Sequence, residues 1–593
     1  MKRNKKTGPY DEILGPLPAE LAAVVRGVVR RTKLWPGEKR DVCQELAGHF
    51  LDGLETLQRD PGLDAEAAAK RLAECFGDEK VAARLIRRSK KRCRPLIWKA
   101  WIRSCQSVGV CILLLVLVGG WRLTGKPHPT VNYVAQLNQQ ADAIPESDRA
   151  WPLYLQAIER FTGTWAYSFG QEETWPDLRP GDPEWGEVQK WLADCQPVIE
   201  ILKDAARRPH YGAAYQVGFE EAILGYRYRQ TKHRYPNLGP FDRWKQETVA
   251  ENKTNNSNEV PMMMEVLLGH LPPMREMSKM MVLYARDCAA QGRIAEAVDH
   301  LLLVHRIGCQ LLQDAIVITQ MVGAENVRIA GDAMRSLLTK HGPELSRQDL
   351  QRLSHQWAAN VPVGGIRIHL GFERLAFADT VQHAFTKNPW GDGHLVLRGE
   401  RSALSLTDTW VVGNAGFSIR EPVEMLFLHA GRKETLAKHE EVWGELTKRW
   451  SAPLYSPQRK CVDQKYNEMF DTWWSSRRYH FICTMFPSLA RADEVLRQTA
   501  MSHEATLVVT ALTARRNETG AYPQALSELV PTYLPGVPED VYDGGPLKYR
   551  LDAGGQPVLY SIWENFVDDG GRACAKENRH RVEGDKVYFG SGA

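Results

Sequence analysis

Ser104–Trp121, SCQSVGVCILLLVLVGGW, is a run of eighteen uncharged and mostly apolar residues that decides how this chain is organised. A helix of about 18 or more such residues is long enough to cross the hydrocarbon core of a bilayer. We therefore expect one membrane span, with about a hundred residues before it and a much longer region after it. Because the run lies so far from the first residue, we expect an uncleaved anchor and not a signal peptide.

Charge is distributed unevenly on the two sides of this run. Residues 1–103 carry 23 Lys and Arg against 14 Asp and Glu, whereas the rest of the 593-residue chain carries 53 against 58. The basic residues that flank the run are Arg84, Arg87, Arg88, Lys90, Lys91, Arg92, Arg94, Lys99 and Arg103 before it, and Arg122 and Lys126 after it. An excess of Lys and Arg marks the cytoplasmic side of a membrane protein. This pattern predicts a cytoplasmic N-terminus and an extracytoplasmic C-terminal region.

The basic excess also bears on partners. It lies beside the predicted span, where Lys and Arg attract anionic lipid headgroups. We therefore expect the lipid bilayer as a partner and no nucleic acid, together with unidentified protein partners on both sides of the membrane.

The region before the span is predicted to be a small helical bundle. Pro36-Gly37-Glu38 is a helix start, and the residues that then recur every three or four positions are Val42, Leu46, Phe50, Leu54 and Leu57. Asp64 is a candidate N-cap for the next helix. A further helix is expected to run through Val81, Leu85 and Ile86.

Two runs in this bundle carry a family resemblance. DVCQELAGHFLDGLETL, followed by DAEAAAKRLAECFGDEKVAARLIRR, resembles the HAAS (permease-prefix) family over residues 36–92. The resemblance implies a cytosolic helical domain placed just before a membrane span, as in bacterial signalling and transport proteins. Together with the charge pattern it implies the inner membrane of a bacterium, with the N-terminus cytoplasmic and the C-terminal region periplasmic. The matching positions are packing residues, so no catalytic role comes with them.

The clearest helical stretch after the span is Pro272–Leu338, where two apolar stripes are joined at Gly292. Six cysteines follow the span without the spacing of metal ligands. Cys288 and Cys309 flank the predicted hairpin and are the best candidates for a disulfide, if one forms. The alternative is that all six are unpaired core cysteines.

The C-terminal region carries a second resemblance. A long amphipathic helix begins at Pro487, and RRNETGAYPQALSELVPTYLPGVPEDVYDGGPLKYRL and PVLYSIWENFVDDGG follow it. This order is similar to the globular half of major pseudopilins of type II secretion over residues 495–571. The family's apolar helix and prepilin cleavage site are missing just before this region. We therefore expect a domain borrowed from that family and not a fibre-forming pilin.

The pseudopilin family often holds calcium in the loop that corresponds to residues 565–571. The resemblance implies that Asn565, Asp568 and Asp569 offer oxygen ligands to a calcium ion, as hard cations require. The alternative is that Asp-Asp-Gly-Gly makes only a tight, solvated turn.

No catalytic motif is found in the sequence. There is no HExxH, no G-x-S-x-G and no dinucleotide fingerprint, and the seventeen histidines show no grouping along the chain. The charges of the stretch GFERLAFADTVQHAF, including Glu373 and Asp379, are expected on a solvated helix face or in local ion pairs. We assign no catalytic or cofactor-binding residue and expect no cofactor other than the candidate calcium.

The sequence therefore predicts a mainly α membrane-anchored protein whose role is a non-catalytic scaffold, envelope-assembly or sensing component. The alternative is a membrane-anchored periplasmic hydrolase assembled from distant residues. The predicted parts are a disordered basic tail (1–17), a cytoplasmic helical bundle (18–95), a juxtamembrane and transmembrane helix (96–123, core 104–121), a linker (124–147), a mainly helical extracytoplasmic domain (148–486) and a pseudopilin-like α+β domain (487–593).

Overall fold

The structure is a computed structural model, and most of the chain is described in it. The described residues are 10–59, 64–93, 96–164, 178–217, 220–235, 237–255, 260–387, 392–396, 424, 427–485, 487–573 and 584–590. The chain is mainly helical, as expected, and divides into two compact units, Met1–Val118 and Gly119–Ala593. The predicted disordered tail, 1–17, lies mostly outside the described residues.

The first unit is a helical bundle. Its described helices are α1 (Asp11–Leu14), α2 (Ala19–Arg31), α3 (Pro36–Gln58), α4 (Ala65–Cys75) and α5 (Glu79–Arg92), followed by most of α6 (Leu96–Arg122). Pro36 begins α3, and the Asp64 carboxylate caps α4 by accepting the Ala67 N–H, both as predicted. Val42, Phe50 and Leu54 are buried in its core.

Helix α5 lies where the sequence predicts a helix through Val81, Leu85 and Ile86. Val81 and Leu85 are 52% and 63% exposed, and Ala83 is the buried residue of this helix. The apolar spacing identified the helix, whereas the face that its neighbours cover was decided by packing between helices.

Helix α6 contains the apolar run. Among the described residues one helix, Ala100–Arg122 within α6, is long and apolar enough to cross a membrane. A core helix of a soluble protein can also meet this test, but such a helix is mostly buried. Only 6% of the apolar window of α6 is buried, and the residues from Ile112 to Leu117 are each more than half exposed.

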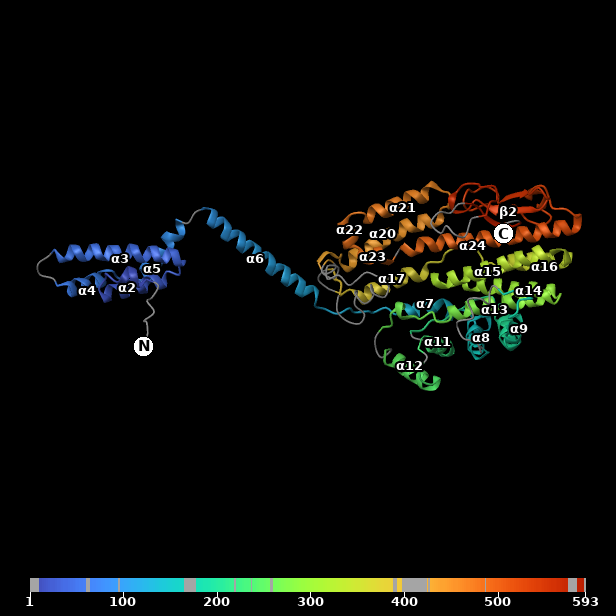
Figure 1. Cartoon of the computed structure of the whole chain (residues 1–593), viewed down its shortest axis with the longest axis horizontal. Helices are drawn as coiled ribbons and strands as arrows, with labels where there is room; N and C mark the ends of the chain where they lie inside the picture. The colour runs from blue at the N-terminus through green and yellow to red at the C-terminus, as the bar shows by residue number, and fades with distance from the viewer. Residues whose placement is uncertain are drawn as a thin grey trace. The chain divides into compact units, whose positions relative to one another are not determined.

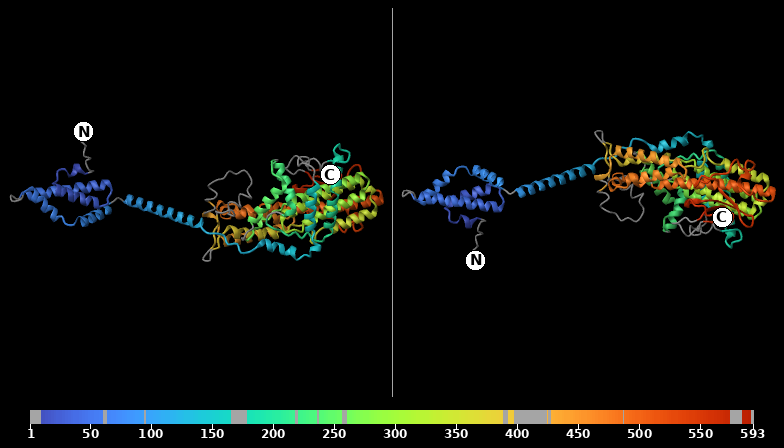
Figure 2. Two further views of the ribbon diagram at one scale, coloured as in Figure 1. Left: turned by 90° about the horizontal axis from the view of Figure 1, so that it is seen from below. Right: turned by 90° about the horizontal axis from the view of Figure 1, so that it is seen from above.

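The second unit consists of helices and, among the described residues, one small sheet (Figures 1 and 2). Its described helices are α7 (Tyr133–Asp142), α8 (Trp151–Thr164), α9 (Trp185–Asp194), α10 (Gln196–Arg207), α11 (Glu221–Arg234), α12 (Phe241–Asn255), α13 (Leu271–Ala290), α14 (Ile294–Leu311), α15 (Val317–His341), α16 (Arg347–Ala359), α17 (Gly371–Ala384), α20 (Arg432–Ser451), α21 (Pro457–Phe470), α22 (Trp473–Arg478), α23 (His480–Met485) and α24 (Pro487–Thr519). Short 3-10 turns are η1 (Glu146–Asp148), η3 (Met263–Glu265), η4 (Gly342–Glu344), η5 (Leu526–Leu529) and η6 (Trp563–Asn565).

The sheet follows α24 and has the strand order β1 (Lys548–Leu551), β2 (Pro557–Ser561), β3 (Lys586–Phe589), with both pairs antiparallel. Lys548 pairs with Tyr560 and Leu551 with Pro557, whereas the β2–β3 pairing is irregular between Leu559 and Tyr560. The first two strands lie where the alternating pattern predicts them. The third strand was not predicted.

The largest core joins the helical body and the C-terminal region. The hairpin of α13 and α14 packs against α15, and α24 packs along α15 and α16 (Figure 1). Residues of α8, α13 and α14 share one hydrophobic cluster with residues of α24 and β3. The predicted boundary at residues 486 and 487 therefore does not separate two cores, because α24 is a central helix of the whole second unit.

Candidate functional site

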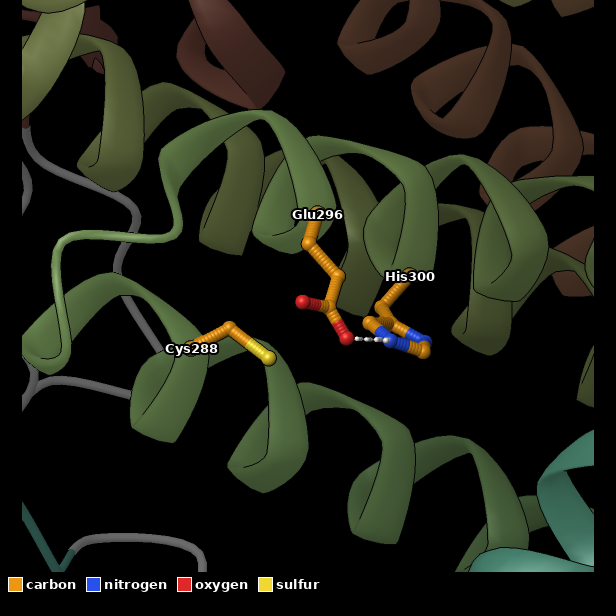
Figure 3. A group of neighbouring side chains, drawn as sticks. All are labelled: Cys288, Glu296 and His300. Carbon is orange, nitrogen blue, oxygen red and sulfur yellow. Dashed lines mark ion pairs between the residues drawn. The ribbon is translucent and has the colours of Figure 1, made fainter.

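A cysteine, a glutamate and a histidine meet between two neighbouring helices of the second unit (Figure 3). Cys288 lies near the end of α13, and Glu296 and His300 lie one turn apart on α14. Side chains at positions i and i+4 point from the same helix face. Gly292 closes the α13–α14 hairpin with a φ of +78°, a conformation that glycine adopts without strain, and so brings Cys288 opposite that face.

Each of these three residues offers one ligand atom, and the three atoms all lie within 4.8 Å of one another. It is the one such group of His, Cys, Asp and Glu side chains found in the described part of the chain. Glu296 Oε1 lies 3.6 Å from His300 Nε2, and Arg293 donates to the other carboxylate oxygen, Oε2. Cys288 and His300 are buried, whereas the Glu296 side chain is 41% exposed and connects the group to solvent.

The protonation states of the group follow from this environment. Burial and the nearby Lys203 charge lower the pKa of His300 despite the opposing effect of Glu296, so the imidazole is neutral at pH 7. Burial and the Glu296 charge raise the pKa of the Cys288 thiol to about 12. Burial opposes ionisation of Glu296, but the Arg293 ion pair outweighs it and lowers the pKa of this carboxyl.

The predicted disulfide between Cys288 and Cys309 is not formed, and both residues are free thiols. Cys288 lies at the closed end of the hairpin beside His300, whereas Cys309 lies nine residues further along α14, against His305. Nine helical residues span about 13 Å. The two α-carbons of a disulfide lie within about 7 Å of each other, so residues that flank a long hairpin in sequence are too far apart to pair.

Of the predicted calcium ligands, Asn565 ends η6, and Asp568 and Asp569 lie on the turn after it. Asn565 Nδ2 donates to Asp569 Oδ2 at 2.8 Å, and Asp568 Oδ1 accepts from the Tyr560 hydroxyl at 3.1 Å. Asp585, which the sequence did not single out, is buried and accepts the N–H groups of Asp569 and Gly571. Hydrogen bonds within the protein therefore stabilise this turn. Calcium binding by Asn565, Asp568 and Asp569 stays a prediction.

Helix α17 carries the charges that were predicted on a solvated face or in local ion pairs, and here Asp379 is buried and Glu373 is half-buried. Asp379 is fully buried, accepts the Met263 N–H at 2.6 Å and lies 3.4 Å from His383 Nδ1. Glu373 accepts the Val317 N–H at 2.9 Å, and burial raises the pKa of its carboxyl to about 7. The solvated face was wrong for Asp379 and Glu373 because α17 packs inside the second unit. The local ion pair holds for Asp379 beside His383, and Arg374 forms an exposed ion pair with Glu440.

A cavity of about 640 Å³ lies between α13 and α15. Its apolar lining includes Val282, Leu283, Ile329 and Leu337, and its cationic lining is Arg179, Lys279, Arg286 and Lys340. Glu325 in this cavity is held by Arg328 with both carboxylate oxygens at 2.7 and 2.8 Å, and Asp332 is paired with Arg335. Carboxylates held in this way by arginine are acceptors in ion pairs and are not poised as general bases.

Three comparisons with known proteins found no match to this chain. No protein-family model matches the chain, no curated protein matches it, and no solved structure matches it. The resemblances to HAAS domains and to pseudopilins therefore rest on the quoted residues alone.

Sequence reasoning missed the cysteine–glutamate–histidine group because it looked for known motifs and for histidines grouped along the chain. A local signal was present, since Glu296 and His300 have the i and i+4 spacing of two residues on one helix face. The third member could be found only by placing α13 antiparallel to α14 in the correct register. A second buried pair, His305 and His503, is separated by 198 residues and has no local signal.

Proposed function

We propose that this chain is a single-pass membrane protein of a bacterial inner membrane, with the second unit outside the cytoplasm as a non-catalytic scaffold or sensing unit. The observation that carries the proposal is the exposure of the apolar helix α6, since only 6% of its apolar window is buried by protein. Lipid would cover this surface, and removal of aliphatic side chains from water is favourable by about 25 cal/mol per Å². The basic residues before α6 orient the first unit toward the cytoplasm.

The non-catalytic part of the proposal is supported by the cavity between α13 and α15. An apolar lining with a few cationic side chains is typical of a binding site. A hydrolase would need an acid or a histidine free to move a proton, but Glu325 and Asp332 are held by arginines and His341 pairs with Glu344 at 2.8 Å. Binding of a partner or ligand is the better-supported use of this cavity.

Labelling of single cysteines tests the membrane topology. Cys75 in the first unit and Cys461 in the second unit are exposed, so each thiol is open to a membrane-impermeant maleimide. In intact spheroplasts, we expect labelling of a variant that retains only Cys461, and labelling of a Cys75-only variant only after lysis. A Cys309-only variant is the matched control, because its buried thiol should react only after denaturation. Labelling of Cys75 in intact spheroplasts would overturn the proposed orientation.

The non-catalytic role has a separate test. The full-length protein in detergent is assayed with chromogenic ester, phosphoester and glycoside substrates, and we expect no turnover above buffer. Turnover that is lost in Glu325→Gln or Asp332→Asn would instead support the membrane-anchored hydrolase.

A further inference from the structure

We propose that Cys288 Sγ, Glu296 Oε1 and His300 Nε2 bind a single Zn²⁺ ion in the second unit. The three atoms already lie within 4.8 Å of one another. In tetrahedral zinc sites the bonds to sulfur, nitrogen and oxygen are about 2.0–2.3 Å, which places ligand atoms about 3.3–3.8 Å apart. Closing the group around an ion therefore requires side-chain movements of about 1 Å and no rearrangement of the helices.

The types of donor atom select zinc over other common divalent cations. A thiolate and an imidazole suit a borderline-soft ion such as Zn²⁺, whereas Ca²⁺ and Mg²⁺ take oxygen ligands. Three protein ligands leave one tetrahedral position for water, and the exposed edge of Glu296 provides a path from solvent for both the ion and the water.

The positions of the ligands are fixed by rigid elements. All three residues lie on α13 and α14, and Cys288 and His300 are held in the main core of the unit. Arg293 holds Glu296 Oε2 and leaves Oε1 directed toward His300. When a neighbouring side chain hydrogen-bonds the carboxylate oxygen that does not bind the metal, it fixes the orientation of the oxygen that does. Arg293 is therefore assigned as a positioning residue of the site.

The same unit contains a second thiol–imidazole contact that serves as a control. Cys309 Sγ lies 3.8 Å from His305 Nε2, and both residues are buried on α14 with four-residue spacing. The two ring nitrogens of His305 are hydrogen-bonded to Asn360 and to His503. Since neither nitrogen is available to an ion, we expect no zinc at this pair.

The test uses the full-length protein in detergent, with a purification tag that lacks histidine. Among the described residues, the cysteines exposed outside α6 are Cys75, Cys93 and Cys461, and they are replaced by serine to remove adventitious thiols. A phosphine reductant keeps the remaining thiols reduced. Zn²⁺ is titrated in competition with a chromophoric chelator, and Co²⁺ is titrated separately as a spectroscopic probe. We expect one equivalent of each metal and a near-ultraviolet thiolate-to-cobalt charge-transfer band.

Variants then assign the ligands. We expect Cys288→Ser to lose the charge-transfer band, and Glu296→Gln and His300→Gln to weaken Zn²⁺ binding by about 100-fold or more, since changes even to outer-shell partners cost about 10–100-fold. Arg293→Gln should weaken binding by about 10-fold. Cys309→Ser should bind like the parent. Circular dichroism and the melting temperature without metal show whether each variant is folded, and Glu296→Gln, at the exposed edge of the site, is the variant least dependent on core packing.

Three results would overturn the proposal. The first is the absence of a stoichiometric zinc complex and of a thiolate-to-cobalt band in the folded parent protein. The second is a complex whose affinity and band are unchanged in folded Cys288→Ser or Glu296→Gln. A band that disappears in Cys309→Ser but persists in Cys288→Ser would place the metal at the other cysteine and would also reject this site. None of these outcomes depends on the membrane topology.

Discussion

His305 and His503 lie with ring nitrogens 3.1 Å apart in the core of the second unit, although 198 residues separate them in the chain. Asn360 Nδ2 lies 3.1 Å from His305 Nδ1 and can only donate to it, so His305 carries its proton on Nε2 and donates to His503 Nδ1. The Trp357 indole stacks on His305 at 3.8 Å between ring centres and donates to the His503 carbonyl. These contacts join α14, α16 and α24.

Replacing His503 by Asn should make stability less sensitive to acid. Burial lowers the pKa of His503 to about 4, so the unfolded chain binds this proton more tightly than the folded chain. Stability is therefore lost as pH falls from about 6.5 toward 4, by up to about 1.4 kcal/mol per pH unit for one group. His503→Asn keeps an acceptor for His305 but does not titrate. Urea denaturation of the full-length protein in detergent at pH 8, 6 and 5 should show that the free energy of unfolding falls less with pH in the variant than in the parent. An equal fall in both proteins would contradict the low pKa of His503.

Glu373→Gln should have the opposite pH dependence. Burial, assisted by the Asp314 charge, raises the pKa of Glu373 to about 7, so the folded chain holds the proton more tightly than the unfolded chain. This contribution to stability is present below about pH 4.5 and is lost as pH rises toward 7. Glutamine keeps an acceptor for the Val317 N–H and stays neutral. We expect the variant to be more stable than the parent by about 1 kcal/mol or more at pH 8 and similar to it at pH 5.

The matched control for Glu373→Gln is Glu441→Gln, because Glu441 is an exposed surface acid paired with Lys438. Its free energy of unfolding should differ from that of the parent by less than about 0.5 kcal/mol at either pH. A gain in Glu441→Gln equal to that of Glu373→Gln would show that general surface charge, and not the buried carboxyl, sets the pH dependence.

Gly308→Ala should destabilise the crossing of α14 and α15. A Cβ at Gly308 would lie 2.8 Å from the Gly323 carbonyl oxygen and 2.8 Å from the Val327 backbone nitrogen, and backbone atoms cannot move aside cheaply. Overpacking of this kind costs about 1–3 kcal/mol. Gly444→Ala in α20 is the control, because a Cβ there meets nothing within 4 Å and should stabilise its helix by up to about 1 kcal/mol. Equal melting temperatures for the two variants would refute the close crossing.

Arg335→Met should weaken the junction of α15 and α24. The buried Arg335 guanidinium donates to Thr506 Oγ1 at 2.7 Å and to the Ser502 carbonyl at 3.1 Å, and it lies 5.3 Å from the Tyr588 ring centre. Hydrogen bonds from charged groups contribute about 1.5–3 kcal/mol, so we expect a loss of about 2–4 kcal/mol in the free energy of unfolding. Arg328→Met removes an exposed arginine that also contacts Asp332 and should cost less than about 1 kcal/mol. Similar losses in the two variants would argue against a buried role for Arg335.

The local features of the fold could be predicted because they depend on neighbouring residues. Pro36 and Asp64 mark helix starts through their own backbone and capping chemistry, and the apolar run in α6 is visible as composition. Faces and partners could not be predicted in the same way. Val81 and Leu85 have helical spacing yet are exposed, and Cys288 and Cys309 flank a hairpin yet lie too far apart to pair.

The candidate site was predictable only in part. Glu296 and His300 share a helix face because the helical period places residues four apart on the same side. Cys288 joins them only when α13 and α14 pack antiparallel in one register, and that register is set by the apolar stripes that meet across the hairpin. The predicted oxygen ligands at residues 565–569 are close together because they lie on one turn.

By itself, the sequence determined the apolar helix, the charge asymmetry around it and the starts of many helices, since these depend on composition and on contacts within a few residues. The tertiary structure alone decided that α24 is a central helix of the second unit, that His305 meets His503, and that a thiol faces a carboxylate and an imidazole across the α13–α14 hairpin. The physical reason is that such contacts form between distant segments, whose positions are set by the packing of whole apolar faces and not by any local pattern.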